Sequence, residues 1–394
     1  MARAGTSSAS GKTTLRFTVV AIENWRNFRR AEIHLSNLAF FIGANASGKS
    51  NLLDAFRFLH EIAAPGSGGL QGAIARRGGV SAIRCLHARS FSAVSLAVTV
   101  GDNDTPGIWR YELTFNVQKG QAPAIIVERL AHNGEDIVRR TKDHGESARE
   151  LTQTHLEQVS KNKDFPDFVA FLASCRYLHV VPQIVRDRRR QNTAGDDPFG
   201  GDLLRRIKEM PQKSRVARLK RIARALEIAV PQFEELDLKD DSEGVPHLYA
   251  KYRNWRPYAT KQAEVAFSDG TLRLIGLLWS ISEKGGPLLL EEPELSLNDA
   301  VVGELPAMFR RVARFSGRQI LASTHAPALL ESPKIGLREV HLLTVGDNGS
   351  EVRTLANMPQ VQAQVEGGMT IAEAVLPLLR PEGIEGLAGA DVIG

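Results

Sequence analysis

The chain has 394 residues, a formal net charge of +5 and 43% hydrophobic residues. Its length allows one large domain with an insertion or two domains. No apolar run reaches the length of about 18 residues that crosses a bilayer, and the first residues lack an apolar signal-peptide core. The two cysteines, Cys85 and Cys175, are isolated, so we expect buried thiols in a cytoplasmic protein without membrane contact.

The chain begins with a small, polar and featureless stretch, and we expect residues 1–14 to form a disordered tail. Gly11-Lys12-Thr13 resembles the end of a phosphate loop, but the preceding Gly5 is one position too far away and no strand leads into it. Loose alternation then predicts two strands, Leu15–Ile22 and Ala31–Leu35.

The most informative segment is Gly43–Ser50, which fits the pattern G-x-x-x-x-G-K-[ST]. In such a loop, backbone N–H groups form an anion nest, the lysine (Lys49) reaches the β- and γ-phosphates, and the hydroxyl of Ser50 can bind Mg²⁺. An apolar strand, Asn37–Ile42, precedes the loop, and apolar residues at helical spacing follow it: Leu52, Leu53, Phe56 and Leu59. A glycine-rich turn without nucleotide is the alternative to this interpretation.

The next segments predict a β-rich region followed by a helical one. Gly66–Gly79 is rich in glycine and predicts a flexible loop with a short helix over Ile74–Arg77. Three runs then suit an antiparallel meander: Phe91–Val100, Trp109–Val117 and Ala124–Leu130. Helix formers and charge follow from Gly145 to Leu238, with a β-like interruption at Arg176–Val181, and Val245–Trp255 predicts a strand that returns to the core.

The helical region carries many basic residues. Between Lys213 and Ala229 apolar positions recur every three or four residues, so one helix face packs and the other is basic; the apolar positions are Val216, Leu219, Ala223 and Leu226. The basic face is either solvated or in contact with a DNA or RNA backbone. The basic residues are Arg186, Arg188, Arg189, Arg190, Arg205, Arg206, Lys208, Lys213, Arg215, Arg218, Lys220, Arg221 and Arg224.

Two further segments carry candidate chemistry. Ser268 to Gly270 lies at the start of an apolar helix and predicts an anion site, or a simple serine cap. Leu288–Leu290 predicts a buried strand that ends in Glu291 and Glu292. One acid there can hold Mg²⁺ and the other can polarise water, although two acids can also be a solvated strand end.

The last part of the chain predicts strands that alternate with helices. The predicted strand Gln319–Ser323 places His325 just beyond its end, where the imidazole can sense a γ-phosphate. Val340–Val345 joins Glu351–Leu355 through Asp347-Asn348-Gly349, which is typical of a hairpin.

The order of these motifs resembles the ABC-type ATPase head of the SMC/RecF-like branch, which includes the ATPase half of OLD-family nucleases and many ATPases of bacterial anti-phage defence. The resemblance covers residues 15–60 and 260–345, and implies an α/β P-loop NTPase fold with an antiparallel β subdomain and a helical insert. It divides the chain into the tail 1–14, a first core half 15–144, the basic helical insert 145–240 and a second core half 241–394.

The resemblance also implies roles for residues. Gly43–Ser50 is the Walker A loop, Phe267–Leu272 the signature, Leu288–Glu292 Walker B, Leu295–Leu297 the D-loop, and Asn24–Arg29 matches the "NFR" strand of such heads. Glu292, Lys49 and His325 are the expected catalytic residues, and Ser50 and Glu291 the expected ligands of Mg²⁺. ATP is expected to contact Gly43, Asn45, Gly48, Lys49, Ser50, Asn51, Ser268 and Gly270.

Some features depart from the family pattern. Glu291 stands where transporter ATPases carry Asp, Leu297-Asn298-Asp299 replaces the usual "LHP", and Gln71 is only a candidate for the glutamine loop. Fewer than 70 residues follow His325, which is too short for the Toprim nuclease domain of OLD proteins plus the remaining strands. We therefore expect no nuclease activity in this chain.

The resemblance implies an ATPase that forms a homodimer or higher oligomer around sandwiched ATP. We expect this assembly to control a nucleic-acid-directed activity in anti-phage defence, with a separate effector protein such as a nuclease or toxin. The alternatives are a DNA repair or recombination ATPase, an ATP-binding scaffold or antitoxin with little turnover, and an ABC transporter subunit.

Overall fold

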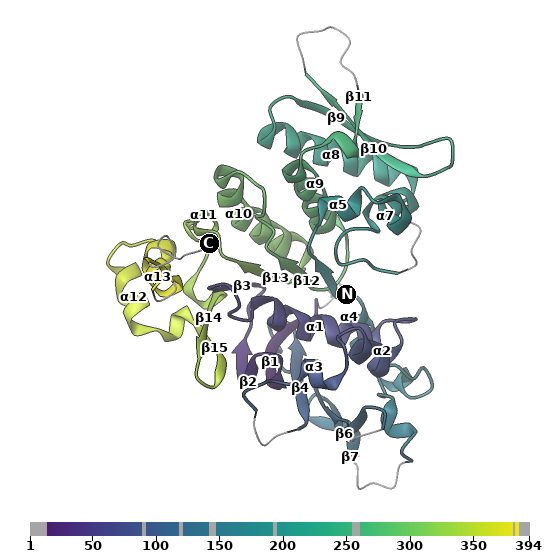
Figure 1. Cartoon of the computed structure of the whole chain (residues 1–394), viewed down its shortest axis with the longest axis vertical. Helices are drawn as coiled ribbons and strands as arrows, with labels where there is room; N and C mark the ends of the chain where they lie inside the picture. The colour runs from purple at the N-terminus through teal and green to yellow at the C-terminus, as the bar shows by residue number, and fades with distance from the viewer. Residues whose placement is uncertain are drawn as a thin grey trace, which may run out of the picture.

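The computed structural model describes residues 14–88, 92–117, 121–141, 147–191, 195–253, 261–380 and 383–385. The predicted tail, apart from Thr14, lies outside these ranges, as does Gly11–Thr13. Three sheets organise the fold: a six-stranded core sheet, a six-stranded antiparallel sheet and a three-stranded sheet. Figure 1 shows the core sheet near the middle, between the other two.

The core sheet has the strand order β15-β14-β3-β13-β12-β8, and all neighbouring strands are parallel except the β14–β15 hairpin. Its strands are β3 (Leu38–Gly43), β8 (Arg176–Leu178), β12 (Leu288–Glu291), β13 (Ile320–Thr324), β14 (Val340–Gly346) and β15 (Gly349–Thr354). The predicted hairpin and the predicted strands around Leu288, Gln319 and Val340 are confirmed.

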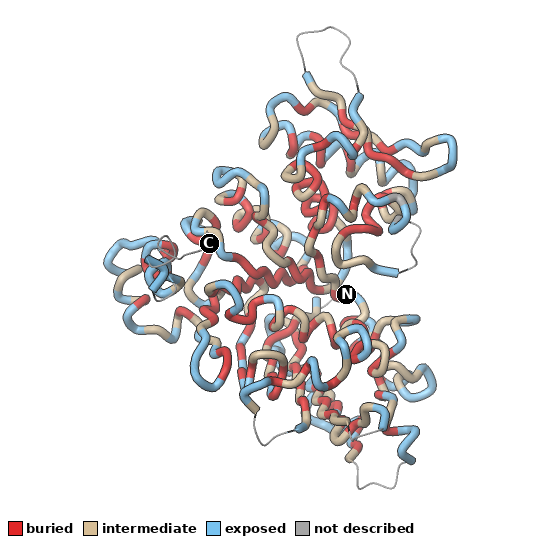
Figure 2. The backbone as a smooth tube through the Cα atoms, viewed as in Figure 1, coloured by how far each residue is buried: buried red, intermediate tan, exposed pale blue. Residues whose placement is uncertain are grey.

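Helices cover both faces of this sheet, which explains why its central strands are apolar throughout. Leu38, Phe40 and Ile42 pack into one hydrophobic cluster, whereas Ala39 and Phe41 face the other. One face contacts α1 (Lys49–Ala63), and the other contacts α9 (Asp269–Ser282) and α10 (Asp299–Ser316). The buried segments run through the centre of the molecule in Figure 2.

The antiparallel sheet has the order β2-β1-β4-β5-β6-β7 and packs on α1 from the side opposite the core sheet. The predicted meander is confirmed and continues into β7, which was not predicted. The strands are β1 (Arg16–Trp25), β2 (Phe28–His34), β4 (Val94–Gly101), β5 (Trp109–Asn116), β6 (Ala124–His132) and β7 (Glu135–Thr141).

The glycine-rich segment after α1 is more regular than predicted. It folds as α2 (Gly69–Ala75) and leads to α3 (Val80–Ile83), so the expected short helix at Ile74–Arg77 is misplaced. Leu70 and Ile74 are buried, and the carboxylate of Glu157 accepts a hydrogen bond from the Leu70 N–H at 2.9 Å. Burial and this contact with a distant residue stabilise the helix, which local glycine content could not indicate.

The region predicted as helical also needs correction. Arg176–Leu178 forms β8, which pairs with β12 at the edge of the core sheet, and the last predicted helical turns form β9 (Phe233–Asp240) instead. The β10 strand (Pro246–Tyr252) does not return to the core sheet, because it pairs with β9 and β11 (Lys261–Ala263). The helices are α4 (Pro166–Ala173), α5 (Pro182–Val185), α6 (Arg188–Gln191), α7 (Leu203–Glu209) and α8 (Gln212–Ala229).

The remaining elements are short. They are the helices α11 (Pro327–Leu330), α12 (Pro359–Glu366) and α13 (Ile371–Leu379), and the 3₁₀ turns η1 (Glu150–Thr152), η2 (Asn162–Asp164), η3 (Glu264–Ala266), η4 (Leu337–Glu339) and η5 (Leu355–Asn357). Within the described ranges, no helix combines the length and apolarity needed to cross a membrane. Cys85 and Cys175 are buried and unbonded to each other, as predicted.

Candidate active site

The phosphate loop connects the fully buried strand β3 to the start of α1, as predicted. Two residues of the loop have positive φ, Ala46 at 62° and Gly48 at 102°. A Cβ added to Gly48 would lie 2.3 Å from Nδ2 of Asn27, so both the backbone angle and the neighbouring side chain require glycine. Asn27 lies in the turn between β1 and β2, and thus supports the loop from outside.

Lys49 holds its ammonium group across the phosphate loop. Its Nζ donates hydrogen bonds to the carbonyl oxygens of Gly43 at 2.8 Å and Ala44 at 3.1 Å. Burial lowers the pKa of Lys49, and the charges of Glu292, Glu294 and Glu291 oppose this shift. The cation therefore lies within the electrostatic field of the acids at the end of β12.

The two residues predicted as magnesium ligands lie together. The hydroxyl of Ser50, at the start of α1, donates a hydrogen bond to Oε1 of Glu291, at the end of β12. Burial raises the pKa of Glu291, while the Ser50 hydroxyl acts in the opposite direction. A hydroxyl and a carboxylate oxygen suit Mg²⁺, which commonly uses one or two protein ligands together with substrate phosphates.

Glu292 and His325 follow the adjacent parallel strands β12 and β13 directly and contact each other. Glu291 pairs with Ser323 in register, so Glu292 and His325, one and two residues further along, both lie at the carboxyl edge of the sheet. Oε1 of Glu292 lies 3.2 Å from Nδ1 of His325, and both side chains are partly exposed. Glu292 has a positive φ of 45°, an unusual backbone conformation for a residue with a side chain, and its N–H bonds to the carbonyl oxygen of Ser323.

Glu294 is a further acid of this site that the sequence did not single out. Its Oε1 accepts hydrogen bonds from Oγ1 of Thr324 at 2.7 Å and from the N–H of His325 at 3.1 Å. Its Oε2 is buried and has no hydrogen-bond partner among the described residues. Burial raises the pKa of Glu294, and these hydrogen bonds oppose the shift. Glu294 thus fixes the backbone that carries His325.

The signature segment caps α9 and packs on the D-loop of the same chain. Oγ of Ser268 accepts a hydrogen bond from the Thr271 N–H at 3.2 Å, which confirms the prediction that Ser268 caps the N-terminus of α9. A Cβ on Gly270 would lie 2.4 Å from the carbonyl oxygen of Ser296, whose φ is 61°. In the described residues, neither Ser268 nor Gly270 hydrogen-bonds to the phosphate loop of its own chain.

Arg273, one turn into α9, is a second residue that the sequence did not identify. It lines a small cavity together with Glu291, Glu292 and Pro293. Burial lowers the pKa of Arg273, opposed by the charges of Asp269 and Glu292. The signature helix therefore presents a cation toward the Walker B acids within one chain.

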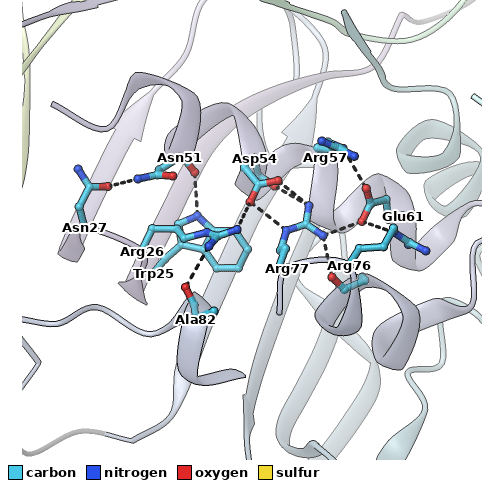
Figure 3. Close-up of polar contacts among 11 residues, drawn as sticks. Trp25, Arg26, Asn27, Asn51, Asp54, Arg57, Glu61, Arg76, Arg77 and Ala82 are labelled. Carbon is cyan, nitrogen blue, oxygen red and sulfur yellow. Dashed lines mark hydrogen bonds and ion pairs between the residues drawn. The ribbon is translucent and has the colours of Figure 1, made fainter. Parts of the chain in front are cut away.

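The other predicted ATP contacts lie in different surroundings. Asn45 is exposed at the tip of the phosphate loop. Asn51 donates a hydrogen bond from Nδ2 to Oδ1 of Asn27 at 2.9 Å, as Figure 3 shows. The Gln71 amide donates to the carbonyl oxygens of Pro123 and Thr152, so it ties α2 to the antiparallel sheet.

Many of the basic residues in the insert have partners in the protein. Arg186 pairs with Asp269 at 2.8 Å and donates to the carbonyl oxygen of Phe267, so it supports the signature segment. Carboxylates also pair with Arg205, Arg206 and Lys208. On α8, Leu219, Ala223 and Leu226 are buried as predicted, but Val216 is 53% exposed. The exposed basic residues of α8 are Lys213, Lys220, Arg221 and Arg224, and their contact with nucleic acid stays a prediction.

Comparisons with solved structures identify similar folds at low sequence identity. The Smc head bound to the C-winged helix domain of ScpA has 13% identity and a TM-score of 0.55, and the match covers 88% of this chain and 99% of that chain. The Smc head domains from Pyrococcus furiosus (13% identity) and Pyrococcus yayanosii (11%) both have TM-scores of 0.51 and match over 89% of this chain and 100% of theirs. No curated protein sequence matches significantly.

A family model described as "AAA domain, putative AbiEii toxin, Type IV TA system" matches residues 38–331, which include the phosphate loop, the signature, both acids of Walker B and His325. The match covers well over half of the chain, and the fold is that of SMC ATPase heads. The protein therefore belongs to this AAA family, and it has the α/β fold of SMC heads.

Proposed function

We propose that the protein binds ATP at the loop Gly43–Ser50 and hydrolyses it with Mg²⁺. The observation that carries this proposal is the convergence of three strand ends on one edge of the core sheet. There the Ser50–Glu291 contact lies beside the Glu292–His325 pair, and the charge of Lys49 interacts with both acids.

The residues of the chain divide the chemistry among them. Lys49 and the N–H groups of the loop bind the phosphates, while Ser50 and Glu291 would hold Mg²⁺. Mg²⁺ supplies charge neutralisation of the phosphate oxygens when bound. The carboxylate of Glu292 would accept the proton of the attacking water, while His325, held through Glu294, contacts Oε1 of Glu292 and orients that carboxylate.

Two substitutions separate binding from hydrolysis. Lys49→Ala removes the phosphate counter-charge, so we expect loss of nucleotide binding in a fluorescent-nucleotide assay. Glu292→Gln keeps binding but lowers kcat by at least about 100-fold, because an amide cannot accept the proton. The matched control is Glu331→Gln, on the exposed end of α11, which leaves kcat unchanged. Wild-type turnover in Glu292→Gln would refute the assignment of the base.

We further propose that ATP pairs two chains and that pairing controls a separate effector, a nuclease or toxin, in anti-phage defence. Support for pairing comes from the position of Ser268 and Gly270, which lack hydrogen bonds to their own phosphate loop among the described residues and are free to complete the site of a second chain. Support for the biological setting is the family description, which names a toxin of a toxin–antitoxin system.

A further inference from the structure

A groove of about 630 Å³ opens between α8 and α10, with the C-terminal half of α9 as its floor. Its walls belong to the helices on the upper side of the core sheet in Figure 1, away from the phosphate loop. Leu278, Ile281, Ile222 and Met308 provide the apolar surface. The groove thus presents aliphatic side chains that could pack against another apolar surface.

The rim of the groove combines cations with an exposed aromatic ring. Arg218 and Arg221 of α8 and Arg311 of α10 lie on the rim, and no acidic residue lines the groove. Phe315 is 78% exposed, and the guanidinium of Arg311 lies 5.9 Å from the centre of its ring. A large exposed aromatic side chain beside an apolar floor is typical of an interaction surface.

The arginines on the rim differ from neighbouring cations in that they lack carboxylate partners among the described residues. Neighbouring cations have carboxylate partners, for example Arg206 with Glu283 and Arg310 with Glu339. Among the described residues, the three rim arginines form no ion pair with a carboxylate. The guanidinium of Arg218 lies over the Trp279 ring, 4.9 Å from its centre, whereas no such ring contact or ion pair engages Arg221 in the described part of the chain. The rim therefore complements a partner that brings negative charge along both edges of an apolar strip.

We propose that this groove binds an acidic amphipathic helix of a partner protein. The apolar face of that helix packs on Leu278 and Ile281, and its flanking carboxylates pair with Arg221 and Arg311. The apolar floor favours a protein helix over a nucleic acid backbone, because aliphatic side chains offer phosphates neither charge nor hydrogen bonds.

The groove also has a structural route to the ATP site. Ser268 begins α9, and Leu278 lies ten residues further along the same helix, or about 15 Å at 1.5 Å per residue. A helix bound in the groove would therefore contact the rigid element that carries the signature. This coupling rests on the proposed ATP-dependent pairing, whereas binding in the groove does not.

A labelled synthetic helix tests the binding itself. The probe is a fluorescein-labelled peptide of about 18 residues, with leucines at helical spacing and glutamates beside them, and its matched control carries lysine in place of glutamate. Fluorescence anisotropy is measured with the full chain at low salt and without nucleotide, so the result does not depend on ATP hydrolysis. We expect the wild-type protein to bind the acidic peptide and not the lysine peptide.

Charge reversal locates the binding. In the double variant Arg221→Glu and Arg311→Glu, we expect the acidic peptide to bind at least about tenfold more weakly and the lysine peptide to gain binding. Arg224→Glu, on the exposed side of α8, leaves both affinities unchanged, and thermal unfolding checks that the variants fold.

Three outcomes would overturn the proposal: no binding of the acidic peptide to the wild-type protein, equal binding of both peptides, or unchanged binding in the double variant. A duplex DNA or RNA oligonucleotide that displaces the peptide from the wild-type protein and loses its own binding in the double variant would instead identify a nucleic acid groove. If the wild-type protein binds the acidic peptide but does not hydrolyse ATP, only the proposed enzymatic function is refuted.

Discussion

At two positions of the candidate site, the space left by neighbouring atoms admits only glycine. Gly48 and Gly270 belong to the proposed ATP site, and a side chain at either position would also collide with a neighbour within this chain. A Cβ at Gly48 would meet the Asn27 amide, and a Cβ at Gly270 would meet the carbonyl oxygen of Ser296. The tight packing at Gly270 predicts that a substitution there lowers turnover, whereas loss of a phosphate contact alone would lower nucleotide affinity.

Gly270→Ala should uncouple hydrolysis from nucleotide binding. The new methyl group would lie 2.4 Å from the Ser296 carbonyl oxygen, so the signature and the D-loop must move apart. We expect kcat to fall by about tenfold or more, a stability loss of about 1–3 kcal/mol, and nucleotide affinity within about twofold of wild type.

The matched control is Gly303→Ala in α10, where the nearest atom to the new methyl group lies at 3.6 Å, an ordinary contact distance. ATPase and fluorescent-nucleotide assays check both variants. Normal turnover of Gly270→Ala would show that the contact between signature and D-loop is not needed.

Among the elements, α1 is held on its outer side by a cluster of buried charges. Asp54 and Glu61 project from α1, and Arg77, after α2, donates to both at 2.6 Å; Figure 3 shows Arg77 between them. Arg26 and Arg76 add further contacts. The cluster thus fixes the helix that begins with Lys49 against the segment α2–α3.

Arg77→Met should destabilise the protein strongly. The Arg77 side chain is 5% exposed, and its loss would leave two largely buried carboxylates without their main counter-charge. We expect the free energy of unfolding to fall by about 3–5 kcal/mol in urea titrations. Arg353→Met, which breaks an exposed ion pair with Glu351, should cost less than about 1 kcal/mol. Equal losses in the two variants would contradict a structural role for the cluster.

The strand β14 should make the protein sensitive to acid through His341. Burial lowers the pKa of His341 to about 4, and its Nδ1 bonds to Oγ1 of Thr354 on β15 at 3.0 Å. The folded protein keeps this histidine neutral, while the unfolded chain takes up a proton below about pH 6.5. Stability from this group is therefore present above pH 6.5 and is lost as the pH falls toward 4, by up to about 3 kcal/mol.

His341→Asn should flatten the pH dependence of unfolding between pH 6.5 and 4, because asparagine does not titrate. Urea titrations at several pH values measure this difference. His34→Asn, at an exposed position on β2, should leave the wild-type slope. If His341→Asn retains the full acid sensitivity, other groups cause it.

At the scale of the whole molecule, the proposed pairing predicts that two chains share each ATP site. Ser268→Arg places a bulky cation at the proposed contact with a second chain, at an exposed position that tolerates it in the folded monomer. We expect this variant to fold and to lose turnover, and light scattering of Glu292→Gln with ATP to show subunit pairing.

Mixing two inactive variants gives the sharper measurement. Lys49→Ala has an intact signature and Ser268→Arg an intact phosphate loop, so a mixed dimer regains at most one complete site. We expect partial recovery of ATPase activity in the mixture, at most about half of wild type per mixed dimer. Normal turnover by Ser268→Arg alone would exclude a signature that acts on the second chain.

The sequence by itself determined the features that depend on local patterns. The motif Gly43–Ser50 predicted a strand, loop and helix, and the structure confirms them, because the strand is apolar throughout and the helix follows at the expected spacing. The same holds for the β14–β15 hairpin around Asp347-Asn348-Gly349 and for the Ser268 cap of α9. In each case the residues that form the sequence pattern are the same residues, or close neighbours of those, that form the predicted element.

Only the tertiary structure decided what depends on contacts between distant segments. The β8 strand belongs to the core sheet because it pairs with β12, and β9 is a strand despite its helix-like charges because α8 and β10 bury Phe233 and Leu236. Likewise, Arg186 supports the signature and Glu294 fixes His325 through bonds that the local sequence does not encode. Local patterns determine which groups are present, whereas burial and long-range pairing determine which of them meet.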